Sequence, residues 1–366
     1  MKIFDIITEL EKFAPLSYQE SYDNSGLLVG NTQSEISQIL ISLDCTEKVI
    51  DEAIQRNCNL VISHHPIIFK GLKKITGNTY IERTIIKAIK NDIAIYAIHT
   101  NLDNVLGGVN FKIAEILGLE NVQILAPKSQ ILKKLTVFVP LKNTEEVASK
   151  LYNAGAGQIG NYKNCSFKSS GIGTFQPNSS ANPFLGQINN TETVKEDKLE
   201  VIFPSFLEKK IILEMKKAHP YEEVAYYLEI LENENQEVGS GAVGILKIKD
   251  TNYSVYEHIK KAFNLTFLKR TETTFEINND LKIAVCGGSG VFLLSQAIKQ
   301  KADIFITSDV KYHEFFDADS KITLIDIGHY ESEQFTKELL FDIINKKFIN
   351  IAVLLSNSVT NPVIYN

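Results

Sequence analysis

The chain has 366 residues, a formal net charge of −6, an isoelectric point of about 5.8 and 44% hydrophobic residues. This length allows two or three domains with ample core, and the composition is ordinary for a globular protein. The acidic balance argues against a dedicated nucleic-acid surface, because polyanion binding usually shows as a basic balance, but it does not exclude a local basic patch. No apolar run reaches the roughly 20 residues that cross a bilayer, so we expect no membrane contact.

The first residues and the cysteines indicate the compartment. Apolar side chains within residues 3–10 alternate with Asp5 and Glu9, which predicts an amphipathic helix and not a signal peptide. The four cysteines form no Cys-x-x-Cys pair and stand among apolar or small residues. This pattern is typical of buried free thiols in a reducing compartment. We therefore expect a cytoplasmic protein.

The N-terminal part, residues 1–128, alternates short apolar runs with helical patterns. The runs at 39–43, 60–63 and 93–98 have strand length and are rich in Ile, Val and Leu. Strands that alternate with helices predict β-α-β units and a mostly parallel sheet, whose strands are buried on both faces. We expect this part to form one lobe of a two-lobed α/β core.

Histidines stand directly after two of these predicted strands. His64 and His65 follow the run 60–63, and His99 follows the next run, with Asp103 four residues further on. Open α/β sheets bind ligands outside the carboxyl ends of their strands. The paired histidines taken alone could equally be loop residues, but the repetition of the design favours a site.

The middle part, residues 129–235, differs in character. Two β-α-β halves within about a hundred residues predict a small ferredoxin-like α+β domain. The domain is expected to interrupt the larger core, because a further histidine stretch lies beyond it. Its predicted strands are 135–140, 165–167, 199–203 and 224–230, with helices after Asn143 and at 207–217.

A Gly-x-Gly-x-x-Gly motif at 155–160 resembles a dinucleotide-binding loop. That fingerprint must follow a strand and open a helix, whereas here a helix precedes it and a strand follows. A glycine cap at the end of the helix is the better interpretation.

The C-terminal part, residues 236–366, begins its second lobe with a strand at 281–286, a glycine-rich loop and a helix. Free N–H groups at a helix start attract phosphate or carboxylate, so Gly288, Ser289 and Gly290 are candidate substrate contacts. The loop lacks the Lys-Ser/Thr of a P-loop, and a tight strand-to-helix turn explains it equally well.

Two more strands of this lobe end in titratable residues. Asp309 and His313 follow the apolar run at 304–306; Asp309 is a candidate substrate contact, and His313 could face the same cleft or cap a helix. His329 follows the next run, and Glu333 lies one helical turn further on the same face. That spacing suits two ligands of one metal, or a carboxylate that bridges two.

The collected side chains predict a metal site without thiolates. One tetrahedral zinc uses at most four ligands and often takes cysteine, whereas five nitrogen and oxygen ligands suit two divalent ions about 3.5–4 Å apart. Zinc, manganese, iron and cobalt all accept such ligands, and the default chemistry is hydrolysis. His99 and His313 are candidate acid–base groups. The candidate ligands are His64, His65, Asp103, His329 and Glu333, with Glu333 as the bridging carboxylate.

These segments carry a resemblance to a known family. Ser-His-His-Pro-Ile-Ile-Phe at 63–69, His-Thr-Asn-Leu-Asp at 99–103 and Gly-His-Tyr-Glu-Ser-Glu at 328–333 resemble the signatures of the NIF-three-like dinuclear metal centre family. Residues 23–27 and 308–313, with the glycine-rich loop, are also similar, so the resemblance covers both outer thirds. Members of this family are named GTP cyclohydrolase I type 2 homologs.

The resemblance implies further properties. It implies two metal ions per chain on the ligands already chosen, and a middle part like the PII and CutA proteins, as in longer members. It also implies a toroidal homohexamer whose metal sites face an internal cavity.

We weigh three functions. The first is a metal-dependent hydrolase, with zinc as the first choice of metal, acting on a small phosphorylated or nucleotide-like substrate as a GTP cyclohydrolase would. The second is a regulatory or scaffold ring that the metals stabilise and whose insert senses a ligand or partner. The third is a toroid that encloses DNA, against which the acidic balance counts.

Overall fold

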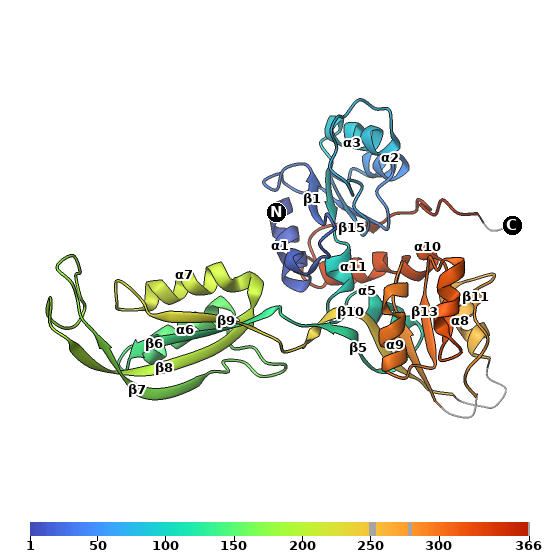
Figure 1. The fold of residues 1–366 in the computed structure, drawn as a ribbon. Helices are drawn as coiled ribbons and strands as arrows, with labels where there is room; N and C mark the ends of the chain where they lie inside the picture. The colour runs from blue at the N-terminus through green and yellow to red at the C-terminus, as the bar shows by residue number, and fades with distance from the viewer. Residues whose placement is uncertain (249–253, 277–279, 365–366) are drawn as a thin grey trace. The chain divides into compact units, whose positions relative to one another are not determined.

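The computed structural model describes residues 1–248, 254–276 and 280–364, which form two compact units (Figure 1). One unit comprises Met1–Ala126 with Glu237–Asn366, and the other comprises Pro127–Gln236. Within the described ranges, no helix is both long and apolar enough to span a membrane. The larger unit contains all three histidine stretches.

The first sheet of the larger unit has the strand order β1-β4-β3-β2-β15. Strands β4, β3, β2 and β15 run parallel, whereas β1 is antiparallel to β4. Every residue of β2, β3 and β4 is buried, which explains their continuous apolar sequences. The strands are β1 (Gly26–Val29), β2 (Ile39–Ser42), β3 (Leu60–Ser63), β4 (Ala94–Ala97) and β15 (Val353–Leu355).

The second sheet has the order β11-β14-β13-β12-β10-β5. Its centre, β12-β13-β14, is parallel, but β11 and β10 pair antiparallel with its two sides. The expectation of mostly parallel sheets therefore needs correction, because both sheets are mixed: one edge strand, β1, is antiparallel in the first sheet, and β10 and β11 flank the parallel centre of the second. The strands are β5 (Glu120–Lys128), β10 (Asn235–Leu246), β11 (Lys269–Arg270), β12 (Leu281–Val285), β13 (Ile304–Thr307) and β14 (Thr323–Asp326).

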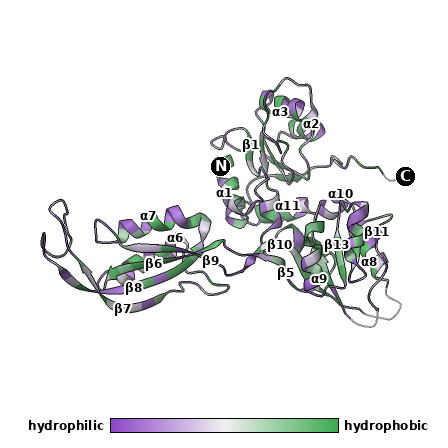
Figure 2. Ribbon diagram, in the orientation of Figure 1, coloured by the Kyte–Doolittle hydropathy of each residue, from purple (hydrophilic) through white to green (hydrophobic). Residues whose placement is uncertain are grey.

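Helices separate and cover the two sheets. One continuous apolar core takes residues from both sheets and from α1, α5, α8 and α11. Helices α2 and α3 pack on the other face of the first sheet, and α9 packs on the other face of the second. Figure 2 shows the matching pattern of hydropathy, with β13 drawn mainly as hydrophobic. The helices are α1 (Ile3–Phe13), α2 (Glu47–Gln55), α3 (Tyr80–Lys90), α5 (Val109–Ile116), α8 (Val255–Phe263), α9 (Leu294–Lys299) and α11 (Thr336–Asn345).

The smaller unit is an antiparallel sheet of order β7-β8-β6-β9 with two helices on one face. Its chain order is strand, helix, strand, strand, helix, strand. Gly155 ends the first helix with a φ of 111°, so the Gly-x-Gly-x-x-Gly motif begins as a helix cap, as expected. The elements are β6 (Leu132–Pro140), α6 (Thr144–Ala154), β7 (Phe167–Phe175), β8 (Glu192–Pro204), α7 (Glu208–Ala218) and β9 (Tyr226–Leu231).

Truncating a core residue of β3 should destabilise the lobe that carries the paired histidines. Ile62 is fully buried, so Ile62→Ala should lower the free energy of unfolding by about 2–5 kcal/mol. The matched control is Ile349→Ala, where the side chain is 84% exposed and the expected change is below about 0.5 kcal/mol. Urea unfolding measures both, and equal shifts would contradict the assignment of Ile62 to the core.

Candidate metal centre

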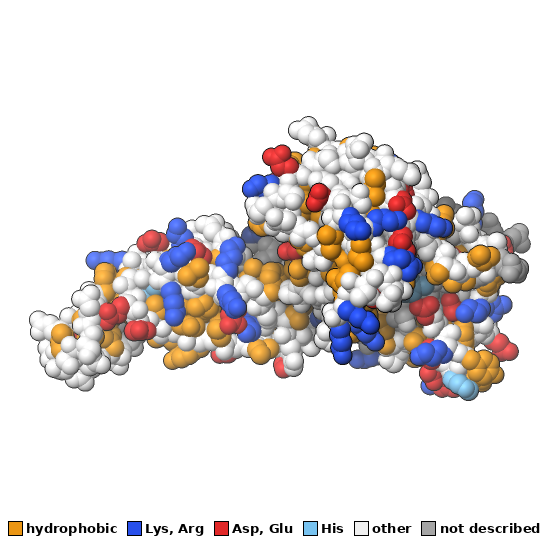
Figure 3. Space-filling view, turned by 90° about the horizontal axis from the view of Figure 1, so that it is seen from above, with side chains coloured by type: hydrophobic (Ala, Val, Ile, Leu, Met, Phe, Trp, Pro, Cys, Tyr) orange, Lys and Arg blue, Asp and Glu red, His pale blue; other side chains and the backbone are white. Residues whose placement is uncertain are grey.

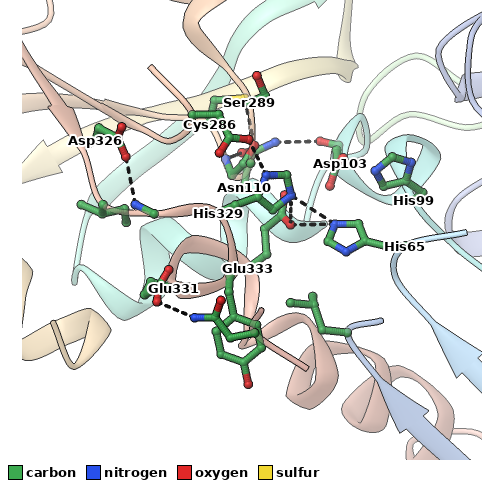
Figure 4. A pocket seen from close by; sticks show the side chains of 18 of the residues that line it. His65, His99, Asp103, Asn110, Cys286, Ser289, Asp326, His329, Glu331 and Glu333 are labelled. Atoms are coloured by element: carbon green, nitrogen blue, oxygen red, sulfur yellow. Dashed lines mark hydrogen bonds and ion pairs between the residues drawn. The ribbon is translucent and has the colours of Figure 1, made fainter. Parts of the chain in front are cut away.

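The candidate site lies where the carboxyl ends of both parallel strand sets meet. His64 and His65 follow β3, and Asp103 ends the short helix α4 (Thr100–Asp103) after β4. His329 and Glu333 begin and end α10 (His329–Glu333) after β14. Residues from both lobes line one cavity of about 830 Å³ (Figure 4).

Three imidazoles at the site are held from behind through Nδ1. In each case an oxygen acceptor fixes the Nδ1–H, so Nε2 is the nitrogen that can offer a lone pair to a metal ion once any proton on it is lost. Metal-bound histidines almost always show this arrangement, because the outer acceptor sets the tautomer and the ring orientation. The pairs are His64 with the carbonyl of Ile98 (2.8 Å), His65 with Asp44 (2.8 Å) and His329 with Asp309 (2.6 Å).

Glu333 joins two of these imidazoles. Its Oε2 lies 3.0 Å from Nε2 of His65 and 3.1 Å from Nε2 of His329, and the two Nε2 atoms are 3.3 Å apart. Metal–ligand bonds of 2.0–2.1 Å in a tetrahedral site separate neighbouring ligand atoms by about 3.3 Å. The three atoms therefore have the spacing that one metal ion requires, and they form one of the clusters that could hold such an ion.

The other oxygen of Glu333 faces a second set of donors. Oε1 lies 3.9 Å from Nε2 of His64, which in turn lies 3.6 Å from Oδ1 of Asp103. Nε2 of His64 and Oδ1 of Asp103 are buried without a hydrogen-bond partner in the described part of the chain. A buried polar atom without a partner costs about 1–3 kcal/mol, and a cation between them would remove that cost.

Burial and close contacts between charged groups shift the pKa values of the site residues. Burial and the neighbouring Glu333 raise the pKa of Asp103, whereas hydrogen bonds from His329 and His65 hold the pKa of Glu333 well below its usual range despite burial. Burial lowers the pKa of His64 to about 3. Hydrogen bonds to carboxylates outweigh burial at the other two imidazoles, raising the pKa of His65 to about 9 and that of His329 to about 11.

His99 stands beside the same cluster. Its ring nitrogens lie close enough to those of His64 and His65 to share a metal ion, and its Nδ1 pairs with Oδ1 of Asp23 at 2.8 Å. Hydrogen bonding to His99 outweighs burial and lowers the pKa of Asp23. The 16% exposed His99 therefore has a fixed ring and access to the cavity, which suits a further ligand or a proton carrier.

The glycine-rich loop contacts Glu333 closely and has few free N–H groups. A Cβ on Gly288, where φ is 60°, would come within 2.4 Å of Oε1 of Glu333. The N–H groups of Gly288 and Gly290 donate to Ser332 and Thr307, so an anion would have to displace those hydrogen bonds. Ser289 is exposed and lines the cavity, and it is the member of the loop best placed to meet a substrate.

The two remaining predicted residues have different surroundings. Asp309 lines the cavity, but its carboxylate accepts the hydrogen bond from His329 and thus orients a candidate ligand. His313 lies exposed on the 3₁₀ segment Tyr312–Ala318, where its ring contacts Tyr312 and Phe316. The structure does not bring His313 to the cavity.

The sequence analysis did not predict the residues that hold the candidate ligands in place. Asp44, which holds His65, could have been found because it directly follows the predicted strand 39–43. Thr360 donates to the other oxygen of Asp44 at 2.5 Å, and Asn361 lines the cavity and donates to Glu331 at 2.8 Å. No local pattern marks these two, because they reach the site only through the path of the C-terminal segment.

Comparison with known proteins decides the family. The family described as Duf34/NIF3 (NGG1p interacting factor 3) matches residues 1–362. The chain belongs to the DUF34/NIF3 family. The family resemblance of the histidine segments is thereby confirmed over nearly the whole chain.

Curated and solved relatives of this DUF34/NIF3 chain match it from end to end. A "GTP cyclohydrolase 1 type 2 homolog" from Halalkalibacterium halodurans is 40% identical over 365 residues, which cover 98% of this chain and 97% of that protein. The protein of that name from Bacillus subtilis is 39% identical over 363 residues, or 98% and 96% of the two chains. The crystal structure of a Bacillus cereus protein related to NIF3 superposes with a TM-score of 0.82 at 36% identity and covers 100% of this chain and 99% of that one.

Removing the charge behind His65 should weaken metal binding. Asp44→Asn keeps the size of the side chain but loses the carboxylate that orients the ring, so we expect the metal affinity to fall about 10–100-fold. Competition with a chromophoric chelator measures the affinity. The matched control is Asp51→Asn on α2, whose partner is Lys87, and it should bind metal like the unchanged protein. Equal affinity of both variants would contradict the role of Asp44.

Metal binding should release protons and strengthen as pH rises. His65 and His329, with raised pKa values, carry protons at neutral pH and must lose them to bind a metal. We expect on the order of two protons released per chain at pH 7, and tighter binding from about pH 6 to about pH 9. Calorimetry in buffers of different ionisation enthalpy counts these protons. A pH-independent affinity would show that metal does not bind through these imidazoles.

Proposed function

We propose that this DUF34/NIF3 protein is a dinuclear metal-dependent hydrolase. The observation that carries the proposal is the position of Glu333, which offers Oε2 to one set of donors and Oε1 to another. A buried carboxylate between two donor sets is the arrangement that a bridging ligand requires. The proposed ligands are His64, His65, Asp103, His329 and Glu333.

The donor set favours borderline divalent ions. Imidazole and carboxylate groups suit zinc first, and also manganese, iron and cobalt. Cys286 lines the cavity, but burial raises the pKa of its thiol, so it is not a ready thiolate ligand. Ions bound here would polarise a substrate oxygen and activate water for attack near neutral pH.

His99 is the residue best placed to move a proton. Asp23 fixes its ring through Nδ1, which leaves Nε2 as the atom that can accept or donate a proton in the cavity. For His313, only the sequence pattern supports an acid–base role, because the residue is exposed and does not line the cavity.

The cavity suits a small substrate with a flat ring. Its volume of about 830 Å³ is in the range of small-molecule sites, and Tyr22, Phe69, Phe267 and Phe292 offer exposed aromatic surface around it. We propose a nucleotide-like or phosphorylated substrate, with ring opening of the GTP cyclohydrolase type as the leading reaction; this choice follows the name of the relatives. Ser289 is the first candidate contact, with Gly288, Gly290 and Asp309 around it.

Several wider expectations remain proposals. The smaller unit is proposed to be a ferredoxin-like insert of the PII/CutA kind, which its strand order β7-β8-β6-β9 supports. The chain is proposed to act in the cytoplasm as a homohexameric ring.

We also propose that the protein does not bind nucleic acid. Figure 3 supports this, since positive and negative side chains are interspersed on the face in view and form no continuous basic surface there. A metal-stabilised regulatory ring is the alternative, and loss of the ring on metal removal together with an absence of turnover would favour it.

Elemental analysis of protein purified without added metal or chelator tests the centre. We expect about two metal ions per chain, falling to one or fewer in His65→Ala and Glu333→Ala. The control is His313→Ala, which should keep the full metal content because the residue lies away from the cluster. A content near zero, or one that these substitutions leave unchanged, would remove the chemical basis of the proposal.

Turnover by the metal-loaded protein tests the reaction. A panel of nucleotides and phosphate esters should contain a substrate whose hydrolysis Glu333→Ala abolishes and Asp51→Asn leaves unchanged. Absence of turnover across the panel, with metal bound, would contradict a hydrolase and favour the regulatory ring.

A further inference from the structure

The smaller unit has a cavity of its own, of about 610 Å³, on the sheet face opposite its helices. Leu199 of β8 points into the core beneath α6 and α7, so Glu196 and Lys198, which alternate with it, point to the other face. Strand β7 and two loops, 176–185 and 221–225, wall the cavity. The metal ligands all belong to the other unit, so this cavity is separate from the proposed hydrolase.

Aromatic rings form much of the wall. Tyr221 stands at the centre of a cluster in which its ring centroid lies 5.9 Å from that of Phe175 and 6.3 Å from that of Phe184. Phe138 and Tyr227, with centroids 5.6 Å apart, line the same cavity. The electron-rich faces of such rings attract cations, most strongly where water is excluded.

A buried carboxylate lies within this aromatic wall. Glu196 is only 8% exposed, and its Oε1 accepts a hydrogen bond from the hydroxyl of Tyr221 at 2.9 Å. Its Oε2 lies over Gly173, where a Cβ would come within 2.2 Å, and no hydrogen bond from the described residues reaches this atom. Glu196 lines the cavity, so a ligand that fills the cavity would remove water from this oxygen, which is costly unless the ligand compensates the charge of the carboxylate.

Most of the remaining charges around the cavity are negative. Glu222 and Glu223 line it as well, and Lys198, the one cation among the described lining residues, pairs with Glu200 at 3.0 Å. An anion would meet three carboxylates here, and a neutral apolar ligand would leave Glu196 without compensation.

We propose that the insert binds a small organic cation with an alkylated ammonium group. The methyl or methylene groups of such a ligand contact the aromatic rings, and its charge compensates Oε2 of Glu196. The combination of an aromatic wall and one buried carboxylate distinguishes this class from metal ions, which need several oxygen donors. The insert thereby gains a recognition function that does not depend on the metal centre.

Binding of choline to the full-length protein tests the proposal, with 3,3-dimethylbutan-1-ol as a neutral probe of the same shape. Calorimetry or ligand-observed NMR should show one choline site per chain, with the neutral probe at least about tenfold weaker. Equal binding of the two probes would show an unselective apolar cavity and overturn the proposal, as would absence of choline binding.

Two variants locate the site. Glu196→Gln keeps the side-chain shape but removes the charge, and it should weaken choline binding about tenfold while Glu146→Gln, exposed on α6, changes nothing. Phe175→Leu keeps an apolar wall but loses the ring face, so choline binding should fall and binding of the neutral probe should not. Unchanged choline binding in both cavity variants would place the site elsewhere and overturn the proposal, even with the choline selectivity intact.

Discussion

The carboxylate of Glu333, only 3% exposed, is the group on which the larger unit converges. A buried charge costs several kcal/mol unless partners compensate it, and its partners, His65 and His329, come from different sheets. The two lobes must therefore close on each other before the charge is stabilised. A continuous apolar core through α1, α5 and α11 and a C-terminal strand added to the first sheet provide that closure.

The imidazoles depend on a further shell of fixed acceptors. Asp44, Asp309 and the carbonyl of Ile98 each hold one ring, and Asp23 holds His99 in the same way. These contacts fix the orientation of the rings before any ligand binds. Nε2 of His64 and Oδ1 of Asp103 are buried without a hydrogen-bond partner among the described residues, which lowers the stability of the fold. Such a loss of stability is typical of functional sites.

The smaller unit has its own core and its own cavity. Its apolar residues face α6 and α7, while the opposite face of the sheet carries charged and aromatic side chains around a second cavity. A unit with a separate core can change its ligand without disturbing the proposed metal ligands of the other unit. This architecture allows the larger unit to carry the proposed hydrolysis while the smaller unit binds the proposed cation.

Local sequence determined much of this protein. Strand runs that end in His64, His65 and His329, and the i, i+4 spacing of Glu333, are encoded within about ten residues, so the candidate donors could be predicted. The family could be recognised from the same segments.

Only the tertiary structure decided how these segments meet. Antiparallel strands such as β1 and β10 pair with partners distant in sequence, which no local periodicity predicts. Two N–H groups of the glycine-rich loop, those of Gly288 and Gly290, are engaged by Ser332 and Thr307. His313 carries the same pattern as the donors, yet the chain directs it to the surface. Periodicity reveals which side chains a strand or helix presents together, whereas long-range packing decides which of them share a site.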